Sequence, residues 1–306
     1  MEYLILGGNG FIGSYIVDEV LAKGHNVTVL DIGPEKYREP LPGVKYIFGS
    51  IDNHELLKET FLNKDILIHS VSTTSPFSSN QNIEYDIQSN LINAINIFKI
   101  AAVSKVKRIV YLSSGGAIYG EPTSIPITEN HDTNPISSYG ITKLAIEKYL
   151  KYFSLNFDIE YNIIRPSNPY GPRQNPFSNQ GVISVFLGKV LRGETIEIWG
   201  DGNIAKDYIF ISDLASAIYN ASISKKVSEI YNIGSSTFIS LNDIIDVIKK
   251  VTGKNIEVKH INSNKFDVQK VCLDIEKAKK DLLFEQKTGL LDGISETWNF
   301  VKNIKY

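Results

Sequence analysis

The sequence predicts a doubly wound parallel α/β sheet with a smaller C-terminal lobe, and three observations lead to this fold class. First, short apolar runs alternate with amphipathic segments of roughly 10 to 20 residues, as strands joined by helices do. Second, a glycine-rich turn follows the first apolar run. Third, the 306-residue chain is 42% hydrophobic and 22% charged, which is typical of a globular protein with a sizeable core.

The apolar runs of the first half are the expected strands. Consecutive parallel strands are connected by right-handed crossovers, so these runs should form one sheet. They are residues 3–6, 26–30, 45–48, 66–69, 108–112 and 161–165.

After Arg165 the composition changes, because PSNPYGPRQNPFSNQG is rich in Pro, Gly and Asn and predicts a loop without regular structure. A strand at 207–211 should then return to the first sheet. The other expected elements are a helix at 182–192, a strand at 196–199 and helices near 213–222, 240–252 and 287–303. We therefore expect a sheet domain over 1–168 with a returning segment near 204–234, and a smaller lobe built from 169–203 and 235–306.

Composition and charge argue against several classes of partner. A net charge of −2 gives no bulk attraction to nucleic acid, and no apolar run reaches the roughly 20 residues of a membrane span. We expect a cytoplasmic protein that binds neither nucleic acid nor membrane. The single cysteine, Cys272, allows no internal disulfide, and no two histidines have the spacing of ligands on one helical face, so we expect no metal.

The turn GGNGFIG has the features of a dinucleotide site. Gly7, Gly10 and Gly13 follow the first strand and begin a helix, whose free N–H groups can bind phosphates. Asp31 ends the second strand, 18 residues after Gly13, where a carboxylate would accept hydrogen bonds from the adenosine ribose. That charge repels a 2′-phosphate and no Arg or Lys follows before Lys36, so NAD is favoured over NADP. The alternative is a glycine turn without a ligand.

A Tyr–Lys pair provides a candidate for proton transfer. Tyr139 and Lys143 in SYGITK are four residues apart, which on a helix puts both side chains on one face. An ammonium beside a phenol favours the phenolate, so we expect the pKa of Tyr139 to be lowered toward working pH. We also expect Lys143 to reach the nicotinamide ribose. A surface Tyr–Lys pair without function is the alternative.

Together these motifs resemble the extended short-chain dehydrogenase/reductase family, in particular nucleotide-sugar 4-epimerases of the UDP-galactose 4-epimerase type. The resemblance extends from Gly7 to about Trp298 and includes GGNGFIG, VLD, ILIH, SNLINAINIFKIAA, YLSSGGAIYG, SYGITK, RPSNPYGPRQ, WGDGNIAKDYIFISDLA and YNIG. It implies a Rossmann-type NAD-binding domain, a substrate-binding lobe and a role in carbohydrate metabolism such as polysaccharide biosynthesis. It also implies a mechanism in which Tyr139 removes the 4-hydroxyl proton and hydride passes to tightly bound NAD. The 4-keto sugar then turns over and takes the hydride back on its other face.

The resemblance assigns further residues to the cofactor and the substrate. For the cofactor it adds Phe11, Ile12, Ser50, Ile51, Ser70 and Asn90. For the nucleotide sugar it adds Ser114, Gly115, Asn168, Val182, Trp199, Lys206 and Val271.

Four positions on the substrate side depart from the family pattern or bear on substrate binding. Lys206 and Asn264 stand where the family has arginines that grip the diphosphate, and lysine lacks the bidentate geometry of arginine. Val271 corresponds to a gate beside sugar C2, and its small side chain suggests that N-acetylhexosamines can enter. Trp199 would stack on the base, or else simply pack at a strand end.

The stretch LSSGGAIYG departs most from the family. Gly115 occupies the position of the usual Ser or Thr, so we expect the adjacent Ser114 to supply the hydroxyl, helped by the flexibility of Gly115-Gly116. Ser72, Thr73 and Thr74 are more distant candidates. Elimination chemistry needs acid or base groups at positions 116 and 117, which hold glycine and alanine, so dehydration and decarboxylation are not expected.

Two other functions stay open on the sequence alone. A nucleotide-activated 4-keto-6-deoxysugar reductase would use the same Tyr–Lys pair but consume NAD(P)H, and a non-catalytic NAD- or nucleotide-sensing protein could be built on the same fold. The resemblance also implies a homodimer, in which helices near 84–103 and 138–156 pair as a four-helix bundle.

Overall fold

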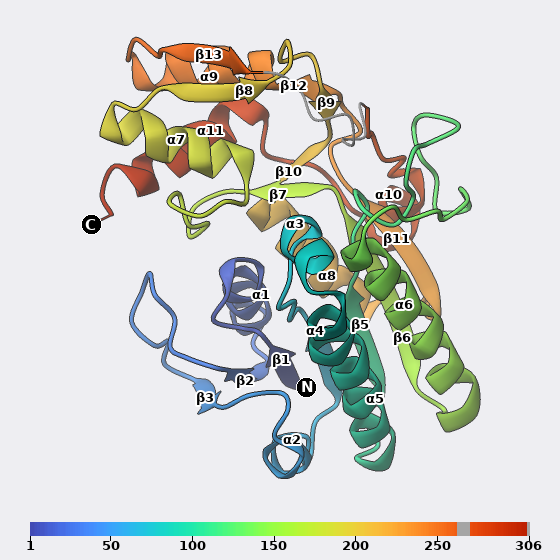
Figure 1. The fold of residues 1–306 in the computed structure, drawn as a ribbon. Coiled ribbons are helices and arrows are strands. Elements are labelled where there is room, and N and C mark those ends of the chain that lie inside the picture. Colours follow the sequence, from blue (N-terminus) through green and yellow to red (C-terminus); the bar gives the residue numbers. More distant parts are fainter. Residues whose placement is uncertain (262–269, 305–306) are drawn as a thin grey trace.

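A seven-stranded parallel sheet forms the centre of the computed structural model, which describes residues 1–261 and 270–304 (Figure 1). The strand order is β11-β6-β5-β4-β1-β2-β3, and each neighbouring pair is parallel. The strands are β1 (Glu2–Leu6), β2 (Asn26–Asp31), β3 (Val44–Phe48), β4 (Ile66–His69), β5 (Arg108–Leu112), β6 (Glu160–Pro166) and β11 (Glu229–Ile233). This order reverses between β1 and β4, which is where ligands bind in doubly wound folds.

Helices cover both faces of the sheet, and each face has its own hydrophobic cluster. On one face, α1 (Phe11–Ala22) packs beside α8 (Ile211–Ile223), and on the other α5 (Asn93–Val103) packs beside α6 (Ser138–Phe157). The connections carry α2 (His54–Thr60), α3 (Pro76–Gln81), α4 (Ile83–Asp86) and the π-helical turn η1 (Ile87–Ile92). The predicted fold class is thus confirmed.

Most of the remaining elements lie beyond the carboxyl ends of the central strands, at the top of Figure 1, whereas α10 (Glu276–Leu282) packs against β11 and α8. Three two-stranded pairs, β7 with β10, β9 with β12 and β8 with β13, lie there together with the helices α7, α9 and α11. The elements are β7 (Asn168–Tyr170), α7 (Val182–Arg192), β8 (Ile196–Trp199), β9 (Ala205–Lys206), β10 (Tyr208–Phe210), β12 (Ile239–Ser240), α9 (Leu241–Thr252), β13 (Val258–Ile261), α10 (Glu276–Leu282) and α11 (Leu290–Val301). The proposed division of the chain into two domains stays a prediction.

Two predictions for this part of the chain were wrong. The strand expected at 207–211 does not return to the main sheet: β10 pairs with β7, and β11 completes the sheet instead. The loop after Arg165 was expected to lack regular structure, but it contains β7. Pairing with a strand some 40 residues later stabilises this short segment, and such a long-range contact leaves no local signal.

Two further features bear on the classes of partner discussed above. Across residues 1–261 and 270–304, no helix is both long and apolar enough to cross a membrane. In the same part of the chain, no three His, Cys, Asp or Glu side chains converge as metal ligands would.

Candidate active site

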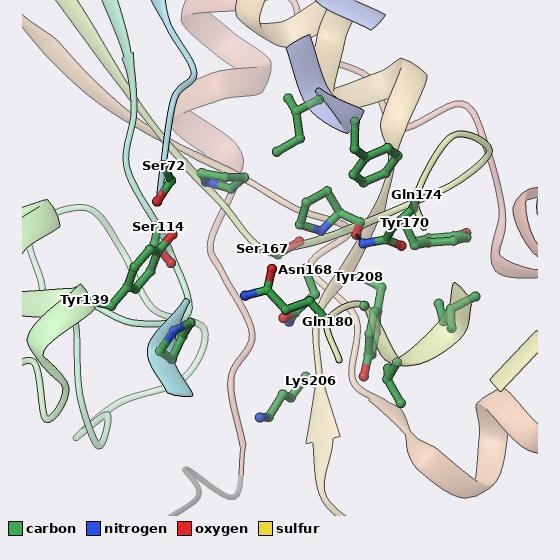
Figure 2. A pocket seen from close by; sticks show the side chains of 18 of the residues that line it. Ser72, Ser114, Tyr139, Ser167, Asn168, Tyr170, Gln174, Gln180, Lys206 and Tyr208 are labelled. Carbon is green, nitrogen blue, oxygen red and sulfur yellow. Dashed lines mark hydrogen bonds between the residues drawn. The ribbon is translucent and has the colours of Figure 1, made fainter. Parts of the chain in front are cut away.

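A cavity of about 800 Å³ opens where the carboxyl ends of β4, β5 and β6 face the upper elements (Figure 2). Parallel strands end together at one edge of a sheet, so side chains from distant parts of the sequence meet there. Figure 2 shows Ser72, Ser114 and Tyr139 on one side and Lys206 and Tyr208 on the other. Ten of the predicted site residues line the cavity: Phe11, Ile12, Ser70, Ser114, Tyr139, Lys143, Asn168, Val182, Trp199 and Lys206.

The glycine turn forms a cradle next to this cavity. Gly7 has φ +79°, and a Cβ on Gly13 would lie 2.0 Å from the Gly7 carbonyl oxygen, so no other residue fits at Gly13 without a shift of the backbone. The helix α1 that follows begins at Gly10 without a side-chain cap, which leaves its first N–H groups for a ligand. The Asp31 carboxylate lies beside the turn and accepts the Asn9 N–H at 2.9 Å. This arrangement fits the phosphates and ribose of a dinucleotide.

Three other predicted cofactor residues lie outside the cavity lining. Asn90 is buried, and its side-chain oxygen accepts the N–H of Thr73 at 2.9 Å, so in this structure it holds the loop after β4. Ser50 donates to Asp52 at 3.0 Å, and Ile51 between them is buried. Ser70, by contrast, lines the cavity while its hydroxyl donates to the Leu6 carbonyl oxygen at 2.6 Å.

Lys143 is held rigidly inside the site. The side chain is 5% exposed, and its Nζ donates to the Leu112 carbonyl oxygen at 2.9 Å. Nζ also lies 5.6 Å from the centre of the Tyr139 ring, so the helix brings the predicted pair together. Burial lowers the pKa of Lys143 to about 8, although the nearby Asp86 and Glu147 carboxylates act against this shift.

Tyr139 does not have the lowered pKa that the sequence suggested. Burial raises the pKa of its phenol to about 12, and this effect outweighs the hydrogen bonds to Ser114 and Ser72, which lower it. The expectation overlooked that Lys143 is itself buried and that the Asp86 carboxylate also raises the phenol pKa. The hydroxyl of Tyr139 is therefore protonated at neutral pH in this structure.

The structure explains why a glycine stands at position 115. Gly115 packs against the end of β6, and a Cβ there would lie 2.6 Å from Leu273 Cδ1 and 2.9 Å from the Pro166 carbonyl oxygen. A side chain at this position has no room. Ser114 instead lines the cavity and hydrogen-bonds to Tyr139, while its predicted contact with a sugar oxygen stays a prediction. Gly116 is exposed, and a Cβ added there would meet no other part of the described chain within 4 Å.

The substrate residues predicted by resemblance are only partly brought together. Asn168 lines the cavity while its Nδ2 donates to the Asp207 carbonyl oxygen at 2.8 Å. Val271 does not line the cavity: its side chain is 4% exposed and packs in the main hydrophobic cluster. Arg173, in the loop after β7, pairs with Asp18 at 2.6 Å. Asn264 lies outside the described residues.

Several lining residues were missed from the sequence. Ser72, treated as a distant candidate, hydrogen-bonds to Tyr139, because the loop after β4 folds back over the cavity. The Ser-rich run STTSPFSS was the available signal for this loop. Others include Pro76, Phe77, Gln174, Gln180, Tyr208 and Leu241, which carry no motif of their own.

Comparison with known proteins identifies the family. The profile of the NAD-dependent epimerase/dehydratase family matches residues 3–234, which include the glycine turn and the Tyr–Lys pair. The chain belongs to this family. Its members are enzymes that use NAD, and the cradle described above fits that cofactor.

Relatives within the family cover the whole length of the chain. A candidate UDP-glucose 4-epimerase of Methanocaldococcus jannaschii is 35% identical over 302 residues, which are 98% of each chain. A dTDP-4-dehydro-6-deoxyglucose reductase of Escherichia coli is 30% identical over 312 residues, covering 99% of this chain and 97% of the reductase.

Solved structures of family members have the same fold. The UDP-glucose 4-epimerase of Thermotoga maritima with UDP-glucose has a TM-score of 0.94 and 32% identity, with 98% of each chain covered. That of Thermus thermophilus with NAD has a TM-score of 0.92 and 28% identity over 99% of each chain. A UDP-N-acetylglucosamine 4-epimerase of Methanobrevibacter ruminantium has a TM-score of 0.92 and 26% identity, with 98% of this chain and 97% of the other covered. Over nearly its whole length, the chain is therefore similar to nucleotide-sugar 4-epimerases.

Proposed function

We propose that this enzyme interconverts the C4 epimers of UDP-hexoses, of the UDP-glucose/UDP-galactose type. The observation that carries the proposal is the placement of one phenol, Tyr139, among the hydroxyls of Ser114 and Ser72 at the wall of a cavity that the dinucleotide cradle adjoins. A second observation is that positions 116 and 117 carry no ionisable group, which leaves oxidation and re-reduction at C4 without an elimination step.

In this proposal Tyr139 is the group that exchanges a proton with the sugar 4-hydroxyl. NAD⁺, when bound between the glycine turn and Lys143, supplies the hydride acceptor and a cationic ring whose charge favours the phenolate. Ser114 and Ser72 donate hydrogen bonds that stabilise the phenolate form, since both lower the pKa of the phenol.

Lys143 and Ser114 have supporting roles in the same step. The bond from Lys143 to the Leu112 carbonyl oxygen fixes the ammonium at the cavity wall, where it would hold the nicotinamide ribose of a bound cofactor. Ser114 would orient the sugar oxygen, because its hydroxyl lies on the cavity wall beside Tyr139. Both assignments are proposals that rest on position.

We assign the other end of the cavity to the nucleotide. Trp199 offers a flat ring to a base, Lys206 offers a cation to the diphosphate, and Asn168 lines the same cavity. Val271 is recessed from the cavity and so does not narrow it, which supports access for N-acetylhexosamines. The likeness to the Methanobrevibacter ruminantium enzyme agrees with this wider specificity.

We further propose a cytoplasmic homodimer formed through α5 and α6. Tyr149, Tyr152 and Leu155 are exposed on α6, and Val103 is exposed at the end of α5, so apolar side chains on this pair of helices have no cover within the described chain. A four-helix bundle between two copies would bury them. Light scattering should give the mass of a dimer for the protein and of a monomer for Leu155→Glu.

The test of the reaction is incubation of the purified enzyme with UDP-glucose without added cofactor, followed by NMR of the anomeric protons. We expect UDP-galactose to form until equilibrium, and the protein to contain NAD released by denaturation. UDP-N-acetylglucosamine in a parallel reaction tests the wider specificity. A protein that carries NAD but converts none of a panel of UDP- and dTDP-sugars would contradict the proposal.

The likeness to the Escherichia coli reductase favours one alternative, a 4-keto-6-deoxysugar reductase. That enzyme would consume NAD(P)H in a one-to-one ratio with a keto sugar. Loss of absorbance at 340 nm on addition of a dTDP-4-keto-6-deoxysugar would therefore favour the reductase, and stoichiometric loss without any epimerisation would replace the epimerase proposal.

A further inference from the structure

We propose that Asp86 is a positioning residue: a buried carboxylate that ties the helix carrying Tyr139 and Lys143 to the loop facing it and keeps the Lys143 ammonium charged. Its catalytic consequence rests on the proposed function. Its effect on Lys143 does not, and can be measured on the protein alone.

One oxygen of Asp86 holds the start of α6. The residue is 0% exposed, and its Oδ2 accepts hydrogen bonds from Ser138 Oγ at 2.7 Å and Thr142 Oγ1 at 2.8 Å. These two hydroxyls immediately precede Tyr139 and Lys143 in the sequence. Because consecutive residues of a helix are about 100° apart around its axis, anchoring Ser138 and Thr142 fixes the rotation of the face with the Tyr–Lys pair.

The other oxygen holds the loop after β4. Asp86 Oδ1 accepts from Asn90 Nδ2 at 3.0 Å and from the hydroxyl of Thr74. Asn90 in turn binds the N–H of Thr73, next to the Ser72 that bonds to the Tyr139 hydroxyl. A single carboxylate thus connects two elements that meet at the phenol.

The four partners of Asp86 are all neutral, so none of them cancels its charge. By contrast, Glu147, one turn after Lys143 on α6, has its charge cancelled. Its carboxylate forms a two-point ion pair with Arg165, at 3.0 and 2.6 Å. An uncancelled charge in a buried site acts over a longer range than one in an ion pair. This charge raises the pKa of Lys143 and also that of Tyr139.

The other titratable groups near Lys143 in the described chain lie on α6, β5 and β4. Glu147 on α6 also raises its pKa, and the Tyr139 phenol lies on the same helix. From β5, the Tyr111 ring packs under Nζ at 5.1 Å, and burial keeps this phenol protonated by raising its pKa. From β4, burial lowers the pKa of His69 to about 3, so its ring is neutral. Among these described groups, Asp86 is therefore the anion without a cationic partner.

The direct experiment is an NMR titration of ¹³Cε-labelled lysine in the free protein, with Lys143 assigned by the loss of its signal in Lys143→Arg. Asp86→Asn removes the charge with little change of shape, and we expect the titration of Lys143 to move to lower pH by about one unit. Thr142→Val is the matched control, because it removes one hydrogen bond to the same carboxylate but leaves the charge. It should leave the Lys143 titration in place.

The same titration decides against the proposal if Lys143 titrates at an unchanged pH in Asp86→Asn, or if Thr142→Val moves it as far. Should Asp86→Asn fail to fold, Asp86→Ser removes the same charge with a smaller polar side chain and is expected to give the same shift. None of these results depends on whether the protein epimerises a sugar.

The pH profile of kcat then tests the catalytic consequence. Removing an anion lowers the pKa of both Tyr139 and Lys143, so both limbs of the profile should move to lower pH in Asp86→Asn. A merely structural role would lower the maximum without moving the limbs. Activity absent from the wild-type protein would count against the proposed function alone.

Discussion

The two ends of the cavity are built differently. At the catalytic wall, Lys143 and Asp86 are almost fully buried and both hydrogen-bond to other parts of the protein, whereas at the nucleotide end the Trp199 side chain is 52% exposed. Packed, hydrogen-bonded groups cannot adjust separately, while an exposed ring can move with its ligand. The comparison suggests that the wall determines the chemistry and the far end determines affinity.

The strongest test of the comparison is Tyr139→Phe. It removes only the hydroxyl that would exchange the proton, so kcat should fall about a thousandfold while the protein still contains NAD. Enzyme assays with UDP-glucose check the fall in kcat, and measurement of bound NAD after denaturation checks that the cofactor is retained. Activity within a few fold of wild type would remove Tyr139 from the mechanism.

Gly115→Ser tests whether the wall is as tightly packed as the distances suggest. A Cβ at this position would lie 2.6 Å from Leu273 Cδ1, so the substitution should lower the free energy of unfolding by about 1–3 kcal/mol instead of restoring a useful hydroxyl. Gly116→Ser is the matched control, because a Cβ there meets nothing of the described chain within 4 Å. Denaturation by urea should separate the two variants, and equal stability would show that the wall can relax.

Ser114→Ala tests whether the hydroxyls of the catalytic wall act on the Tyr139 phenol. The hydrogen bond from Ser114 lowers the pKa of the Tyr139 phenol, so its loss raises that pKa and the low-pH limb of kcat should move to higher pH. We expect kcat at neutral pH to fall about tenfold, with little change in KM. Ser72→Ala should act in the same direction. A profile that keeps its shape in both variants would mean that these hydroxyls only line the cavity.

Trp199→Ala should have the smallest effect and one of a different kind. The ring is half exposed, so its loss should raise KM for a UDP-sugar several-fold, at about 1 kcal/mol, and leave kcat unchanged. Steady-state kinetics distinguish the two parameters. An unchanged KM would indicate that Trp199 merely packs at the end of β8.

Much of the fold could be predicted because its signals are local. The six apolar runs match β1 to β6, and the helix expected at 182–192 has the bounds of α7. The glycine turn and the Tyr–Lys pair depend on spacing within one turn and one helix, which the sequence alone carries.

The errors concern properties that depend on the whole molecule. The pairing of β10 with β7 joins segments some 40 residues apart, and the raised pKa of Tyr139 comes from burial that no spacing reveals. Asp86 was overlooked for the same reason, since its four partners come from three separate segments. Val271 was placed by alignment with a family gate, but its side chain faces the hydrophobic cluster.

The open space at Gly116 has an evolutionary consequence. Its neighbour Gly115 is confined by backbone, but a side chain at 116 would meet nothing of the described chain within 4 Å, and its backbone does not need positive φ. The family resemblance described above implies that dehydratases and decarboxylases carry acid or base groups at the position of Gly116. A single codon change here could therefore introduce an acidic side chain at almost no cost in stability, so this scaffold can sample new side chains next to the catalytic wall without passing through an unfolded ancestor.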